Sequence, residues 1–478
     1  MSNTSLKDNR LVSQALLDHY RCPEQFLSFR VSEELSSHPG YFHFGSDAIC
    51  YGRSLNGAHR SKLTDSLSDV LTSVSIRGKQ VTLPFDPNEI IDNLRLERYP
   101  STQLSASEIA LKTIYYWFRP AAGVSLRKYV QRVRAANWQK REFPRWPVDA
   151  SVESICENLL LLSLQASGVS RIPFIWFWPH GARSCFSMTH DVETTAGRDF
   201  CAQLIDIDDS FDIKASYQIV PEKRYPVTPE YLRTLRDRGA ELCVQDLNHD
   251  GRLFDDHEEF RRRAARINRY GREYGAKGFR AAVLYRKPEW YKYLDFSYDM
   301  SMPNVAHLDP QRGGCCTVMP YFIGDILELP ITTVQDYTLM QVLSEWSIDL
   351  WRTQIGMILA RNGLVSFIVH PDYIIEPKNQ AVYKDLLAML GQMRKEMSLW
   401  FALPGEVDTW WRARNQMSIV RDEESWTIVG AGAEHARLAF AKIVDGKLAY
   451  ELAGSPPNEI SMPHSNSEEN VPPLTSIS

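Results

Sequence analysis

The sequence lacks the features that mark secreted, membrane or nucleic-acid-binding proteins. Its longest apolar runs, such as Leu364 to Val369, are strand-sized, whereas a bilayer-spanning helix needs about 20 residues. The first ten residues are polar and contain no apolar segment like that of a signal peptide, so we expect a cytoplasmic protein. The chain carries 54 basic and 59 acidic residues, a net charge of −5, which argues against a dedicated nucleic-acid binder.

Several catalytic signatures are also missing. No C-x-x-C pair occurs among the eight cysteines, so we expect buried, reduced thiols, including the adjacent Cys315 and Cys316. There is no G-x-S-x-G elbow, which argues against a serine hydrolase. Neither a G-x-x-x-x-G-K-[ST] loop nor a G-x-G-x-x-G turn is present, which argues against a nucleotide-dependent enzyme.

Strand-like and helix-like segments alternate through the middle of the chain. The strand-like runs are 185–189, 215–220, 241–244, 278–282, 296–300, 326–331 and 364–369. Helix-like segments separate most of them, and the longest is 337–361. Such alternation is typical of a parallel sheet covered by helices. Repeated about seven times, it favours a closed or nearly closed barrel over an open sheet.

With 478 residues, the chain is too long for one compact domain. We predict an α/β protein built around a distorted (β/α)7 barrel. The predicted parts are a mainly helical N-terminal region (1–171), the barrel (172–404), a small β appendage (405–453) and a disordered tail (454–478). Helices are predicted over 11–20, 105–118 and 126–138, whereas the tail is rich in Ser, Pro, Asn and Glu.

Polar residues follow four of the predicted strands. They are Asp191 with Glu193, the segment 245–250 that contains His249, Arg280, and His370. Taken singly, each has an ordinary structural explanation, such as a turn cap or a local ion pair. Because the carboxyl ends of parallel strands share one edge of a sheet, we expect these side chains to line a single cleft.

These motifs resemble the polysaccharide deacetylases of the NodB-homology type, carbohydrate esterases with a distorted (β/α) barrel. The resemblance covers roughly residues 172–403. In Thr189-His190-Asp191-Val192-Glu193 it implies Asp191 as the catalytic base and Glu193 as a metal ligand. Asp299 matches a supporting polar position.

The remaining motifs match the family unevenly. His370, in His370-Pro371-Asp372, matches the general acid, and Arg280 matches the arginine that orients the base. Ala282 stands where the family has a proline. At the two metal-binding histidines of the family's H-x-x-x-H motif, this chain has Gln245 and His249.

The resemblance implies metal-assisted hydrolysis of an acetamide on a sugar. A divalent ion, typically zinc, would polarise the carbonyl group and lower the pKa of bound water to about 7. Asp191 would take the proton of the water, and His370 would protonate the departing amine. The products would be acetate and an amino sugar, and the expected substrate is a carbohydrate such as a surface-glycan precursor.

Gln245 leaves alternatives open, because a carboxamide oxygen is a weaker zinc ligand than imidazole. Asp246 and Asp250 are the nearby oxygen donors, although strand alternation turns Asp246 away. One alternative is a pseudoenzyme that binds carbohydrate without catalysis. Another is a scaffold protein whose flanking regions bind partners. The sequence favours the enzyme, because Asp191, Arg280, His249 and His370 are all present.

Overall fold

The computed structural model describes residues 10–64, 66–100, 143–422 and 425–454, and the described chain forms two compact units. The first unit combines residues 10–99, 150–182 and 410–454. The second combines residue 100, residues 143–149 and residues 183–409. The predicted helices 105–118 and 126–138 and nearly all of the predicted tail lie outside the described residues. The domain borders predicted at 171 and 404 stay predictions.

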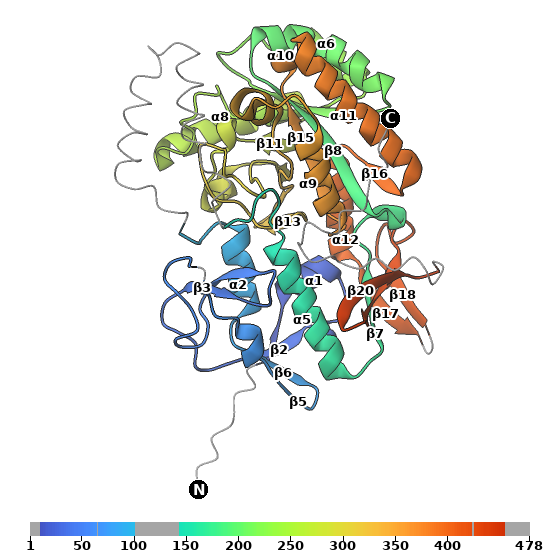
Figure 1. Ribbon diagram of the computed structural model, residues 1–478. Coiled ribbons are helices and arrows are strands. Elements are labelled where there is room, and N and C mark those ends of the chain that lie inside the picture. The colour runs from blue at the N-terminus through green and yellow to red at the C-terminus, as the bar shows by residue number, and fades with distance from the viewer. Residues whose placement is uncertain (1–9, 65, 101–142, 423–424, 455–478) are drawn as a thin grey trace. The chain divides into compact units, whose positions relative to one another are not determined.

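A nine-stranded sheet forms the centre of the second unit (Figure 1). Its path runs β13-β14-β12-β11-β10-β9-β8-β15, and β16 pairs with the beginning of β8. All pairs are parallel except β13 with β14, so the predicted α/β fold is confirmed as a curled, open barrel-like sheet. The strands are β8 (Ser184–Val192), β9 (Ala215–Ile219), β10 (Glu241–Gln245), β11 (Gly278–Arg280), β12 (Tyr298–Asp299), β13 (Tyr321–Ile323), β14 (Ile326–Glu328), β15 (Leu364–Val369) and β16 (Leu399–Phe401).

Helices follow most of these strands, as the alternation predicts. Thr194, Thr228 and Asp256 cap the first three, each accepting a hydrogen bond from a backbone N–H three residues on. The helices are α6 (Thr195–Ser210), α7 (Pro229–Asp237), α8 (His257–Tyr274), α9 (Asp349–Leu359), α10 (Pro371–Ile374) and α11 (Pro377–Glu396). Short 3-10 turns are η5 (Ala282–Leu284) and η6 (Pro288–Tyr293).

The predicted single helix over 337–361 is wrong. The chain forms a π-helical turn, η7 (Thr338–Leu343), and Ser344 then adopts a left-handed conformation with φ of 60°. α9 begins only at Asp349, whose backbone N–H donates to the Ser347 hydroxyl. The serines between the two segments offer the backbone alternative hydrogen bonds and so interrupt the helix.

The first unit contains more strands than the sequence predicts, so its mainly helical character is not confirmed. Residues 10–99 hold a four-stranded sheet of order β1-β2-β6-β5 and a β3–β4 pair. The elements are β1 (Arg10–Val12), α1 (Gln14–Tyr20), η1 (Glu24–Phe26), β2 (Ser28–Val31), β3 (Gly40–His43), β4 (Ile49–Gly52), η2 (Val70–Ser73), β5 (Ser75–Arg77), β6 (Gln80–Leu83) and α2 (Pro87–Arg95). These strands have only three or four residues each, too few to show a clear alternation.

The predicted C-terminal strands are present, and they pair with an earlier part of the chain. In the three-stranded sheet β20-β19-β7, Ala439 of β19 lies opposite Phe174 of β7. β17 and β18 form a separate antiparallel pair. The elements are α5 (Ser151–Ser167), β7 (Arg171–Ile175), η4 (Pro179–Gly181), α12 (Pro404–Gln416), β17 (Ser418–Asp422), β18 (Ser425–Val429), β19 (Leu438–Val444) and β20 (Lys447–Leu452). Among all the described helices, none is both long and apolar enough to cross a bilayer.

A buried arginine ties the first unit together. Arg414 is 1% exposed and donates to the backbone carbonyls of His19 (2.8 Å), Ile175 (2.7 Å) and Trp176 (3.0 Å). Burial lowers the pKa of Arg414 to about 9. The side chain therefore serves as a hydrogen-bond donor to two separate backbone segments.

We expect Arg414→Met to destabilise the first unit by about 3–5 kcal/mol, because each buried carbonyl left unpaired costs roughly 1–3 kcal/mol. Urea unfolding followed by tryptophan fluorescence measures the change. Arg412→Met, in the same helix, is the control, because Arg412 is only partly buried. Equal loss in the two variants would contradict this assignment.

Candidate active site

The register of the sheet brings the predicted site residues to one edge. Val369 of β15 lies opposite His190 of β8, so His370 and Asp191 are at the same level. Gln245, the last residue of β10, lies opposite Arg280 of β11. The expectation that distant strand ends meet at one edge rests on parallel pairing, and the pairing observed has the required register.

Arg280 holds the carboxylate of Asp191 in place. Its Nη1 donates to Asp191 Oδ1 (2.5 Å) and to the Thr189 hydroxyl (2.8 Å). Its Nε donates to the carbonyl oxygen of Met300 (3.0 Å), and the Arg280 side chain is 1% exposed. The guanidinium group is thus fixed on both sides and presents a buried positive charge to Asp191.

The opposite face of β8 carries a separate polar network. His190 Nε2 lies 2.9 Å from Asp208 Oδ2, and His190 Nδ1 lies 3.2 Å from the carbonyl oxygen of Val369. Tyr383 donates its hydroxyl proton to the other oxygen of Asp208 (2.6 Å). Because side chains alternate along a strand, His190 faces away from Asp191, and its contacts with Asp208 agree with this. The network links the strand of Asp191 to the strand that precedes His370.

Three nitrogen-bearing groups surround a single oxygen of Glu193. His249 Nε2 lies 2.7 Å from Glu193 Oε1, Gln245 Nε2 lies 3.1 Å from it, and His370 Nε2 lies 3.6 Å from it. Burial alone would raise the pKa of Glu193, but His249 and His370 outweigh it and hold the pKa well below its usual range. Glu193 is therefore an ionised carboxylate at the centre of the cluster.

Asp336 fixes the orientation of His370. Asp336 Oδ1 lies 2.7 Å from His370 Nδ1, and Oδ2 accepts a hydrogen bond from the His370 backbone N–H (2.8 Å). Burial opposes the charged imidazole, but Asp336 and then Glu193 raise the pKa of His370 well above its usual value. His370 is thus a protonated group whose Nε2 faces the cluster.

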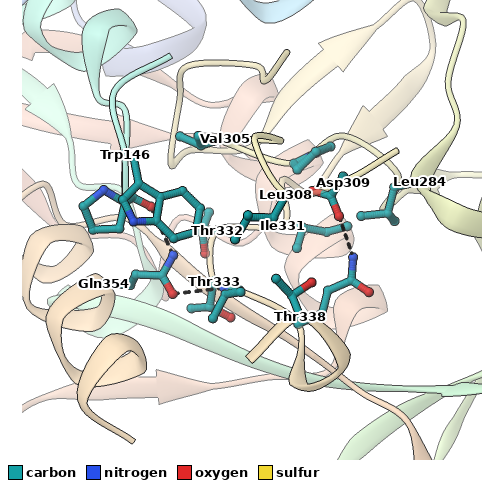
Figure 2. Close-up of a pocket in the computed structure, with 14 residues that line it drawn as sticks. Trp146, Leu284, Val305, Leu308, Asp309, Ile331, Thr332, Thr333, Thr338 and Gln354 are labelled. Carbon is teal, nitrogen blue, oxygen red and sulfur yellow. Dashed lines mark hydrogen bonds between the residues drawn. The ribbon is translucent and has the colours of Figure 1, made fainter. Parts of the chain in front are cut away.

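The loop that carries Asp336 is held from both sides around a small cavity (Figure 2). The backbone N–H of Val334 donates to Gln354 Oε1 (3.0 Å), and Gln335 Nε2 donates to Asp309 Oδ1 (3.1 Å). The cavity measures about 20 Å³, enough for about one water molecule. This region is therefore a support for Asp336 rather than a sugar-binding site.

Gln245 presents its nitrogen, not its oxygen, to the two carboxylates. Its Nε2 donates to Asp191 Oδ2 (3.0 Å) and to Glu193 Oε1 (3.1 Å). Its Oε1 is buried and has no hydrogen-bond partner. Since an amide nitrogen has no lone pair for a metal, Gln245 in this orientation cannot be a ligand.

The remaining donors fit a divalent cation. Asp191, Glu193 and His370 each offer an atom within 4.8 Å of the others. His249 Nε2 lies 2.7 Å from Glu193 Oε1, so the two groups form an ion pair beside this cluster. Carboxylate oxygen and imidazole nitrogen are both ligand types that suit a transition metal.

The two other predicted oxygen donors are engaged elsewhere. Asp250 Oδ1 pairs with Arg263 at 2.9 Å. Asp246 Oδ1 accepts a hydrogen bond from the backbone N–H of Leu247. Neither belongs to the cluster of donors around Glu193.

Asp299 stabilises the backbone next to Arg280 through the Ser301 hydroxyl. The Ser301 hydroxyl donates to Asp299 Oδ1 (2.8 Å) and accepts from the backbone N–H of Ala281 (2.8 Å). Asp299 pairs across the sheet with Glu328, another fully buried acid. Burial raises the pKa of both groups, and the negative charge of Asp299 raises the pKa of Glu328 further.

We expect this acid pair to make stability fall as pH rises. Because the pKa of Glu328 is raised in the folded state, its contribution is complete below the unfolded pKa of about 4.3 and is lost as pH rises through the folded pKa. Glu328→Gln should remove up to about 1.4 kcal/mol of this loss per pH unit. Urea unfolding between pH 5 and 8 measures it, and parallel pH profiles of variant and wild type would contradict it.

Models of protein families and curated protein sequences provide no match to this chain. Similar solved structures do exist. A Mycobacterium smegmatis protein described as a polysaccharide deacetylase is 17% identical, with a TM-score of 0.42, over 52% of this chain and 98% of that one. A family 4 acetyl xylan esterase from Clostridium thermocellum, in complex with a cobalt ion, is 15% identical, with a TM-score of 0.31, over 48% of this chain and 91% of that one.

A CE4 family pseudoenzyme from Bacillus anthracis is 15% identical, with a TM-score of 0.31, over 47% of this chain and 65% of that one. The solved structures similar to this chain thus include polysaccharide deacetylases. This is the family that the sequence motifs resemble. At these identities and TM-scores, the roles of individual residues depend on the geometry of the site itself.

Asp336, the partner of His370, is not among the site residues predicted from the sequence. Asp336 lies between β14 and η7, eight residues beyond the last residue of β14, so a search of strand ends for acids does not include it. Asp208 and Tyr383 lie within helices, and no local pattern marks them. Their contacts depend on packing between segments that are distant in sequence.

Proposed function

We propose that the chain is a metal-dependent deacetylase that hydrolyses an N-acetyl or related acyl group on a carbohydrate. The observation that supports this most directly is the pair of charge-fixed groups, Asp191 with Arg280 and His370 with Asp336, around Glu193. Enzymes that cleave amides need both a base and an acid, and here each is oriented by a partner of its own. The motif resemblance implies that the substrate is a carbohydrate, which we propose is a surface-glycan precursor.

Aromatic side chains beside the proposed acid suit a sugar. The Tyr373 ring lies 5.2 Å from the His370 ring and stacks on Tyr337 at 5.5 Å. Both tyrosines are partly exposed. Rings with one apolar face and a polar hydroxyl tip are well suited to contact a pyranose next to the reacting amide.

In this reaction Asp191 takes a proton from water while the water oxygen adds to the acyl carbon. Arg280 keeps the carboxylate of Asp191 oriented throughout. The C–N bond then breaks, and His370 donates its Nε2 proton to the departing sugar amine. The products are a carboxylate such as acetate and an amino sugar.

Glu193 and His249 are the residues that we assign to hold the divalent ion. When bound, such an ion polarises the acyl carbonyl group and lowers the pKa of water. Zinc is the ion implied by the motif resemblance.

The test is acetate release from a chitin oligosaccharide, measured with a coupled assay on protein treated with EDTA and then given Zn²⁺, Co²⁺ or Mn²⁺. We expect release with at least one ion and none with EDTA. Activity that is equal with and without EDTA would contradict the metal requirement. No release with any ion, on several acylated sugars, would contradict the enzyme.

A second function, a carbohydrate-binding pseudoenzyme, is favoured by one observation. The Gln245 amide bridges Asp191 and Glu193, and so gives both carboxylates a hydrogen bond without a cation. This alternative predicts that the protein binds the oligosaccharide equally well with and without EDTA and does not cleave it. Isothermal titration calorimetry with the same chitin oligosaccharide distinguishes the two functions.

A further inference from the structure

The two ends of the Gln245 amide lie in opposite environments. The nitrogen end is hydrogen-bonded to two carboxylates, whereas the oxygen end is buried and has no partner. Gln245 is 1% exposed, so water does not readily reach the oxygen. An unpaired buried carbonyl is unfavourable by about 1–3 kcal/mol. The observed orientation therefore satisfies the carboxylates at the expense of the amide oxygen.

We propose that Gln245 is a rotating ligand. Without a cation, its nitrogen bridges Asp191 and Glu193; when a divalent ion binds, the amide turns about its last torsion and its Oε1 becomes a ligand. This inference deepens the proposed function, because it rests on the metal site assigned to Glu193 and His249.

The rotation requires little movement of the protein. The terminal torsion of glutamine is broad and roughly two-fold, so the two amide orientations fill nearly the same volume. Turning the amide loses the hydrogen bonds to Asp191 and Glu193 but none at Oε1, which has no partner to lose. A cation beside Glu193 replaces the hydrogen bond to Glu193, since it neutralises that carboxylate, while Asp191 keeps its hydrogen bond from Arg280.

The ligand set that results is rich in oxygen. Glu193 and Gln245 each supply an oxygen, and His249 supplies an imidazole nitrogen. Oxygen ligands suit Mn²⁺ and Mg²⁺, whereas a site with a second imidazole in place of the amide suits Zn²⁺ better. Two hydrogen bonds must also be broken before the amide oxygen can bind the ion. The site should therefore bind Mn²⁺ reversibly and prefer Zn²⁺ over Mn²⁺ only weakly.

Isothermal titration calorimetry of the full chain with Mn²⁺ alone tests the rotation, without any assay of activity. Gln245→Leu removes both the bridging nitrogen and the candidate oxygen ligand. If Oε1 is a ligand, this substitution weakens Mn²⁺ binding by at least tenfold. If the amide only competes with the ion, the same substitution strengthens Mn²⁺ binding, and the proposal is overturned. Unchanged binding in the variant also overturns it. So does a wild-type protein that binds no Mn²⁺ up to millimolar concentration.

Gln218→Leu is the matched control. Gln218 is a fully buried glutamine on the adjacent strand β9, and its Nε2 donates to the Ser216 hydroxyl (2.8 Å) rather than to a carboxylate. This variant should bind Mn²⁺ within about threefold of the wild type. An equal loss in both variants would show that loss of a buried amide, and not of a ligand, weakens binding.

A crystal soaked in Mn²⁺ gives a second test that needs no variant. The anomalous signal locates the ion, and a ligating Gln245 oxygen must lie about 2.0–2.6 Å from it. An ion bound to Glu193 and His249 but more than 3.5 Å from the Gln245 amide would overturn the rotation. That result would leave the proposed deacetylase activity standing. A protein that binds Mn²⁺ but releases no acetate would contradict the deacetylase activity and leave the rotation of Gln245 standing.

Discussion

Asp191→Asn is expected to lower kcat/KM for acetate release by about 10²–10⁴-fold, the usual contribution of a general base. The asparagine side chain has nearly the same shape and still reaches the Arg280 guanidinium through its oxygen. It cannot take a proton from water, so the chemical step is lost, while the hydrogen bond from Arg280 is kept and the one from Gln245 Nε2 to Asp191 Oδ2 is lost. The assay is the coupled acetate measurement with saturating metal ion.

Loss of stability is the main competing explanation, since Asn leaves the buried Arg280 without a full counter-charge. Asp208→Asn is the matched control. Asp208 is an equally buried aspartate beside His190, on the other face of β8 from the proposed base. Thermal unfolding of both variants shows the change in stability. If Asp208→Asn loses as much activity as Asp191→Asn, then stability, and not base catalysis, explains the effect.

The sequence predicts the second unit well because its two longest strands, β8 and β15, are buried throughout and helices separate most of the others. β8 is buried along all nine residues and β15 along all six, and β15 is apolar at every position except Ser366. Once the strands are parallel, their carboxyl ends must meet, and the positions of Asp191, Arg280 and His370 follow. The antiparallel strand β13 has only three residues and escaped prediction.

The parts that the sequence does not predict depend on contacts between distant segments. The strands of residues 10–99 are too short for a periodicity, and they exist because they pair with one another. The orientation of the Gln245 amide likewise follows from two carboxylates on another strand. The substitution of Gln for His is visible in the sequence, but which end of the amide faces the site is not.

His370→Gln is expected to lower the rate of amide cleavage by about 10²–10⁴-fold and to leave the cleavage of an activated ester nearly unchanged. The reason is the leaving group. A sugar amine departs only after it is protonated, whereas 4-nitrophenolate departs without a proton. Comparing a chitin oligosaccharide with 4-nitrophenyl acetate at the same metal concentration therefore isolates the acid step. A metal-binding role for His370 would instead lower both rates together.

Asp336→Asn extends the same test to the partner of His370. Asp336 contacts both the ring and the backbone N–H of His370. If it acts only by orienting and charging that imidazole, its loss should reproduce the selective effect on amide cleavage. The double variant should then be no slower than His370→Gln alone, because groups that act as one unit are not additive. Fully additive losses would mean that Asp336 serves the reaction independently of His370. The assignment of Asp336 as the group that orients and charges His370 would then be wrong.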